Sequence, residues 1–196
     1  MTDGPQQLTA ILRFSPDSFA ASEWDARCHS GIWEGGRPEM AGEAVWGRDI
    51  GYFEYRLPLP DQIVGRMEDC VLRMEAAGLP AEIRQSVGGR SGLSEVVVSL
   101  NEVPIATWLL DGVRVNSRGA LSRLNRFGSG EYGEVVEARV SAADLPMVES
   151  RARTGGYLIV RLEVKPDSAN PGGLMVFGDR TGRFGLEPTV TLSWSR

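Results

Sequence analysis

The chain has 196 residues, of which 42% are hydrophobic and 24% charged, and its formal net charge is −5. This balance allows a folded core and argues against bulk disorder, and the length suits one domain over residues 1–196. The negative charge and the lack of a basic cluster argue against nucleic acid as a partner, and no apolar stretch approaches the ~20 residues of a membrane span. Residues 1–5 lack the features of a signal peptide, so we expect a cytoplasmic chain or a piece of a longer secreted one.

Short segments in which apolar and polar residues alternate recur along the chain, with turn-forming residues between them. Alternation with a period of two places one row of side chains on each face of a strand. Many such segments at regular spacing predict an all-β fold, an antiparallel β-sandwich with one wet face on each sheet. The expected strands are 8–14, 51–57, 70–76, 96–100, 105–110, 135–140, 157–164, 174–177 and 189–194.

Little helix is expected. Residues 141–144 have the form of a capping box and predict a short helical turn before Pro146. The segment 15–48 is expected to be a long loop, and it carries Trp24, Trp33 and Trp46. Long loops in a compact domain are usually functional or pack over the ends of a sheet.

Several of these segments resemble a known family. Residues 51–60 form an aromatic strand that ends in Leu-Pro, and residues 96–102 form a valine-rich strand that leads into a hairpin at Asn101. Residues 132–145 run from a strand into a short helical turn, and the hydrophobic strand 157–164 follows. In this order they resemble the galactose-binding-like jelly-roll modules of glycoside hydrolase family 2 enzymes, such as β-galactosidases and β-mannosidases.

The resemblance spans residues 51–194, and the C-terminal modules of rhamnogalacturonan lyases are similar in outline. One departure is Glu102, which stands where the family hairpin usually has glycine, so the turn type is expected to differ. Catalysis in family 2 resides in a (β/α)₈ barrel of about 250 residues, which is longer than this chain. The resemblance therefore implies a non-catalytic carbohydrate-binding or accessory module, with carbohydrate and a catalytic glycoside hydrolase domain or subunit as partners.

Two alternatives stay open. The first is a structural or interaction β-sandwich that binds no sugar. The second is a small jelly-roll polysaccharide lyase or hydrolase. We predict no catalytic residue, because His29 is the single histidine and the carboxylates form no pair that their spacing singles out.

A sugar site combines an aromatic platform, on which the apolar face of a pyranose ring stacks, with polar groups that bind hydroxyls. Tryptophans in the long loop are the better platforms, whereas Trp194 lies on an inward row and is expected in the core. Trp108 alternates with apolar neighbours and fits either role. The expected ligand-binding residues are Trp24, Trp33, Trp46, Asn101, Trp108 and Arg118.

Acids and arginines stand two residues apart on several strands, as in Glu54 and Arg56, which places them on one face. The same spacing occurs in the pairs Arg73/Glu75, Glu137/Arg139 and Arg161/Glu163. Such a face is either a set of ion-pair ladders or a polar surface that binds sugar hydroxyls.

We expect no cofactor, with a structural calcium ion at Asp17, Asp179 and Glu187 left open. Cys28 and Cys70 are either free thiols or one disulfide.

Overall fold

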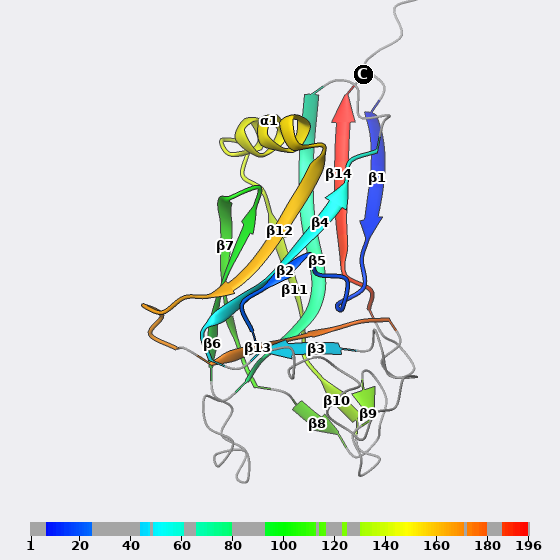
Figure 1. Ribbon diagram of the computed structural model, residues 1–196. Helices are drawn as coiled ribbons and strands as arrows, with labels where there is room; N and C mark the ends of the chain where they lie inside the picture. The colour runs from blue at the N-terminus through cyan, green and yellow to red at the C-terminus, as the bar shows by residue number, and fades with distance from the viewer. Residues whose placement is uncertain are drawn as a thin grey trace, which may run out of the picture.

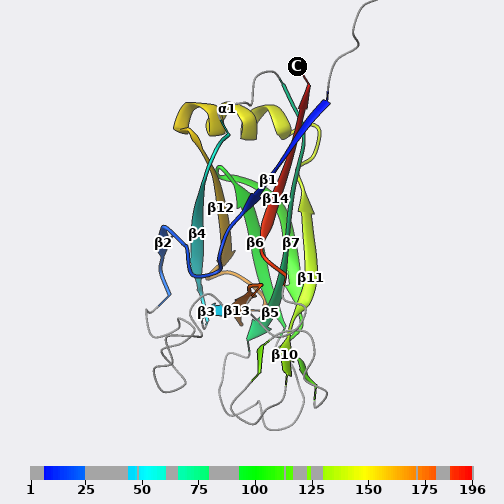
Figure 2. The ribbon, with the colours of Figure 1, turned by 90° about the vertical axis from the view of Figure 1, so that its right-hand side faces the viewer.

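Two antiparallel β-sheets face each other and enclose the main core, which confirms the all-β sandwich (Figures 1 and 2). The computed structural model describes residues 7–24, 44–47, 49–60, 66–79, 93–112, 114–116, 123–124, 130–170, 172–179 and 186–195. Sheet A contains β1 (Gln7–Arg13), β14 (Thr189–Ser195), β5 (Arg66–Leu79), β13 (Gly173–Phe177), β3 (Ala44–Gly47) and β11 (Glu134–Arg139). Sheet B contains β2 (Ala21–Ser22), β4 (Gly51–Pro58), β12 (Tyr157–Val164), β6 (Ser94–Leu100) and β7 (Val103–Leu110).

A small sheet C and one helix lie at opposite ends of the sandwich (Figure 1). Sheet C is formed by β8 (Arg114–Asn116), β10 (Gly130–Tyr132) and β9 (Arg123–Leu124). The helix α1 (Leu145–Gly155) crosses the other end, near the start of β1 and the end of β14.

The alternation in the sequence decides which side chains enter the core. On β12, Leu158, Val160 and Leu162 are fully buried, and their neighbours on the strand are more exposed. On β4, Phe53 and Tyr55 are fully buried in the same core, and the Tyr55 hydroxyl donates a 2.9 Å hydrogen bond to the carbonyl of Pro16. Burying one large apolar side chain contributes roughly 1.5–3 kcal/mol, so these rows hold the two sheets together.

Strand β5 is longer than the sequence predicts, because one strand serves two partners in succession. It pairs with β14 over Arg66–Arg73 and with β13 over Glu75–Leu79, while β11 lies along its other edge. Close to its start the register with β14 shifts, which marks a bulge.

The segment 15–48 is not a continuous loop, because it contains β2 and β3. The inward residues of β3 and β13, such as Val45 and Val176, join the main core. Their outward residues, such as Trp46 and Phe177, form a second buried cluster with Ala77 and Leu79. Both faces of β3 are thus buried, so its sequence shows no alternation that would reveal a strand.

The helix is also longer than expected and starts later. It begins after Asp144 and ends at Gly155, with Gly156 in a left-handed conformation at its C-terminus. Pro146 stands in the first turn instead of stopping the helix, because the first amides of a helix have no intrahelical acceptor and proline loses nothing there.

Candidate functional site

Trp24 lies inside the sandwich and presents no platform for a sugar. Its side chain is 6% exposed and its ring centroid is 4.5 Å from that of Phe53. The indole also packs closely over the backbone of Gly47 and Gly51, where a Cβ atom would collide with it. Stacking on a sugar needs an accessible ring face, so the expected role of Trp24 does not fit this geometry.

Trp46 and Trp108 are buried as well. Trp46 belongs to β3 and packs in the second cluster. Trp108 packs in the main core, and its indole Nε1 donates a 3.3 Å hydrogen bond to the carbonyl of Glu137. Since β7 and β11 are neighbouring edges of different sheets, this bond ties one side of the sandwich together.

Asn101 uses its amide within the fold. It is 4% exposed and occupies the two-residue turn between β6 and β7. Its Nδ2 donates to the carbonyl of Tyr157 and its Oδ1 accepts from the amide of Ile159, both at 3.1 Å. Its side chain is therefore not available for sugar hydroxyls. Trp33 and Arg118 lie outside the described residues.

The turn itself follows from these residues. Asn101 and Glu102 both have positive φ, 47° and 65°, as a type I′ hairpin turn requires. Arg151 of α1 steadies the turn by donating 2.9 Å and 3.1 Å hydrogen bonds to the Asn101 carbonyl and the Glu102 carboxylate. The left-handed turn thus forms although Glu102 stands at a position where a side chain is less favourable than glycine.

The candidate site is a groove on a different surface of the sandwich. An open groove of about 560 Å³ lies on the outer face of sheet A, over β1, β14, β5 and β11. Residues of the segment that leads from β13 into β14, Asp179, Leu186 and Glu187, also line it.

The register of the four strands arranges the floor of this groove in rows that run across the strands. We call one row the charged row: Arg13, Thr189, Arg73 and Glu137 stand opposite one another on neighbouring strands.

We call the next row outward along β14 the apolar row, because it carries Ile11, Thr191 and Val71 before it ends at Arg139. Beyond it stand Thr9, Ser193 and Asp69 in register. The apolar side chains of Ile11 and Val71, with Thr191 between them, are therefore bordered by polar side chains on both sides.

Two ion pairs lie at the margins of the groove. Arg13 Nη1 is 3.4 Å from Glu187 Oε2, and Arg139 Nη1 is 2.6 Å from Asp69 Oδ2. Both arginine side chains are 61% exposed, so each pair contributes only about 0–1 kcal/mol and can rearrange at low cost.

Arg73 lies between these pairs. Among the described residues, neither Arg73 nor its cross-strand neighbour Glu137 has an ion-pair partner. Both residues line the groove.

The sequence predicts each of the four strands that form the groove, but it does not predict the groove itself. The alternation predicts a polar outer face for these strands, and the spacing of Glu137 and Arg139 predicts that these two share it. It does not predict which strands are neighbours, because strand order is a property of the fold. Arg73 and Glu75 do not form the exposed pair that their spacing predicts. Glu75 is buried and accepts a 2.9 Å hydrogen bond from the amide of Gly133, a contact that the sequence does not reveal.

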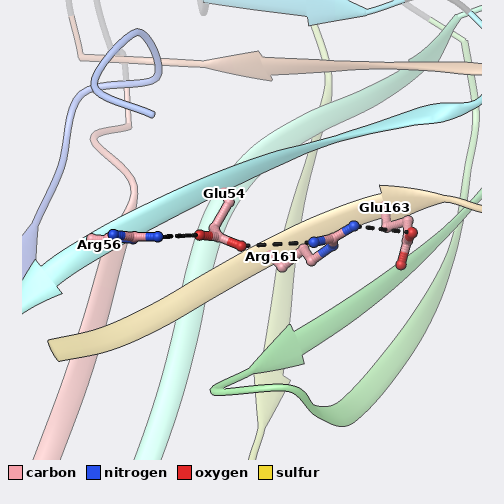
Figure 3. A network of polar contacts seen from close by, with 4 residues as sticks. All are labelled: Glu54, Arg56, Arg161 and Glu163. Carbon is pink, nitrogen blue, oxygen red and sulfur yellow. Dashed lines mark hydrogen bonds and ion pairs between the residues drawn. The ribbon is translucent and has the colours of Figure 1, made fainter. Parts of the chain in front are cut away.

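On the outer face of sheet B, four charged side chains pair with one another (Figure 3). Glu54 lies between Arg56, at 3.4 Å, and Arg161, at 3.7 Å, and Arg161 also contacts Glu163 at 3.4 Å. The Arg161 guanidinium lies 3.6 Å from the ring centroid of Tyr52. This face is an ion-pair ladder with a cation–π contact, the first of the two interpretations of its spacing.

The described residues show neither a metal centre nor a membrane helix. Within them, no three His, Cys, Asp or Glu side chains gather to hold a metal ion, and Asp17, Asp179 and Glu187 do not form such a group. No helix in the described ranges has the length and apolar character needed to cross a bilayer. Cys70 is a free, buried thiol, and Cys28 and His29 lie outside the described residues.

Comparison with known proteins adds no identification: no protein-family model matches the chain, and no curated protein matches its sequence. The inference of function therefore depends on the groove and on the resemblance of the segments.

Proposed function

We propose that this protein is a non-catalytic carbohydrate-binding module of the galactose-binding-like jelly-roll type, and that it binds its ligand in the groove of sheet A. The observation that carries the proposal is the composition of the groove floor. Carbohydrates carry hydroxyl groups around apolar C–H faces, and the groove presents an apolar row between two polar ones. Arginine and carboxylate groups can each make paired hydrogen bonds to neighbouring hydroxyls.

The carboxylates of the groove are poorly suited to glycoside hydrolysis, which supports a binding role. Hydrolysis needs one carboxyl group that keeps its proton, commonly in an apolar pocket. Glu137 and Asp179 are exposed, while Asp69 and Glu187 are paired with arginines. As an accessory module, the protein would hold a glycoside hydrolase domain or subunit close to its polysaccharide.

The second candidate is a structural module that binds no sugar. It is favoured by the burial of Trp24, Trp46 and Trp108, since tryptophans that fill the core are not ligand platforms. The two candidates differ in one respect that can be measured, namely affinity for a carbohydrate.

The test is affinity electrophoresis and calorimetric titration of the full chain against a panel of soluble polysaccharides. Thr191→Arg places a large side chain in the centre of the apolar row and is expected to reduce affinity at least tenfold. The matched control is Thr107→Arg, which alters an exposed threonine on β7 of the other sheet and should leave affinity unchanged. Folded protein without affinity for any polysaccharide would favour the structural module.

A further inference from the structure

The charge of the groove discriminates between classes of carbohydrate. Its lining holds three arginines, Arg13, Arg73 and Arg139, and four carboxylates, Asp69, Glu137, Asp179 and Glu187. Two of the arginines are already paired with carboxylates, which leaves Arg73 beside Glu137 and Asp179. A polyanionic ligand would meet more free carboxylates than free guanidinium groups in a protein of net charge −5.

The direction of the groove sets the shape of the ligand. From Ile11 on β1 through Thr191 on β14 to Val71 on β5, the apolar row spans two interstrand spacings or about 9.5 Å before it ends at Arg139 on β11. A single sugar ring would contact only part of such a row. A chain of several sugar units lying across the strands would cover it.

Resting on the proposed function, we infer that the ligand is an uncharged oligosaccharide chain that lies across the four strands along the apolar row, with Arg73 and Glu137 binding its hydroxyl groups. Arg73 supplies donors only and Glu137 acceptors only, and they stand opposite each other on β5 and β11. Arg13 and Arg139 remain paired with Glu187 and Asp69, Arg13 beside the chain and Arg139 at the β11 end of the row.

The experiment compares three classes of ligand by calorimetric titration of the full chain. These are neutral hexasaccharides of glucose, mannose, xylose and galactose, a hexamer of galacturonic acid, and the corresponding monosaccharides. We expect a neutral hexasaccharide to bind at least tenfold more tightly than the galacturonate hexamer and than its own monosaccharide. Arg73→Gln and Glu137→Gln should each weaken that binding five- to tenfold.

The matched control is Arg56→Gln, which removes an exposed arginine from the outer face of sheet B and should change affinity less than twofold. Urea unfolding of each variant verifies that the fold is kept.

Tighter binding of galacturonate than of any neutral hexamer would overturn the inference about charge and leave the proposed function standing. Equal affinity for monosaccharide and hexasaccharide would overturn the extended chain, and unchanged affinity in both groove variants would overturn the roles of Arg73 and Glu137. Failure of every carbohydrate to bind would overturn the proposed function itself.

Discussion

At the scale of single residues, Asn101 joins the β6–β7 turn to β12. We expect Asn101→Ala to lower the free energy of unfolding by about 1–3 kcal/mol, because two partly buried backbone groups of β12 lose their partners. The change would appear as a lower midpoint in urea. In Asn101→Ala, stability can fall through lost hydrogen bonds or through an alanine at positive φ. Asn101→Gly separates these two causes, because glycine adopts the positive φ freely but has no side-chain amide. A glycine variant as stable as the wild type would show that the hydrogen bonds contribute little.

The sequence of this turn predicts the turn but not the use of its side chain. Asn between two strand-like segments is typical of a two-residue hairpin turn, because asparagine tolerates the positive φ that such a turn requires. The side-chain amide of Asn101 reaches β12 only because residues 160–163 of this strand, more than fifty positions further along the chain, pair with β6. The sequence does not distinguish a polar side chain that binds the backbone of a distant strand from one that binds a ligand.

At the scale of elements, Trp108 connects the edges of the two sheets. We expect Trp108→Phe to lower the free energy of unfolding by about 1 kcal/mol more than Trp194→Phe does. Both changes remove the same atoms from the core, but of these two tryptophans only Trp108 has an indole hydrogen bond within the part of the chain that the structure describes. Urea unfolding followed by far-UV circular dichroism measures both.

If the Trp194 variant loses as much stability as the Trp108 variant, the bond to the Glu137 carbonyl does not hold the edges together. Hydrogen exchange of the β11 amides gives a second readout, since protection should fall along that strand in Trp108→Phe alone.

Some strands and helices can be located from the sequence more accurately than others. Strands with one wet face, such as β4 and β12, alternate clearly and were predicted almost to the residue. β3 is buried on both faces and has no such pattern. For α1 the sequence predicts only a short turn before Pro146, whereas the helix runs to Gly155 and accommodates this proline in its first turn without loss.

At the scale of the whole molecule, folding changes the proton affinity of two core groups. Burial, assisted by the nearby charge of Asp69, raises the pKa of the Cys70 thiol to about 12. Burial, assisted by Asp17, also raises the pKa of the Tyr55 phenol above its usual range. In the unfolded chain these groups titrate near 8.5 and 10.

Stability is therefore expected to decline in alkali. Below about pH 8.5 both groups are protonated in the folded and unfolded chain, and their contribution is fully present. As the pH rises toward 12, the unfolded chain releases protons that the folded protein keeps, and the free energy of unfolding falls by up to about 1.4 kcal/mol per pH unit for each group.

Urea unfolding at pH 8, 9, 10 and 11 measures this slope. In Cys70→Ala the slope should become shallower between pH 9 and 11, although the variant is less stable throughout. Parallel curves for the wild type and the variant would show that Cys70 does not titrate differently in the two states.

The sequence by itself determined the fold class and the identity of the core. Alternation with a period of two is a local property, so it places Phe53, Tyr55, Leu158 and Trp194 inside without knowledge of any partner strand.

Only the tertiary structure decided which polar side chains share a surface. The rows across β1, β14, β5 and β11 exist because strands from both ends of the chain pair with its middle, and that order is set by the packing of the complete sandwich. The same packing placed Trp24, Trp46 and Trp108 in the interior. A tryptophan is a core residue where other parts of the chain cover its ring, and it can be a platform for a ligand only where its ring stays exposed.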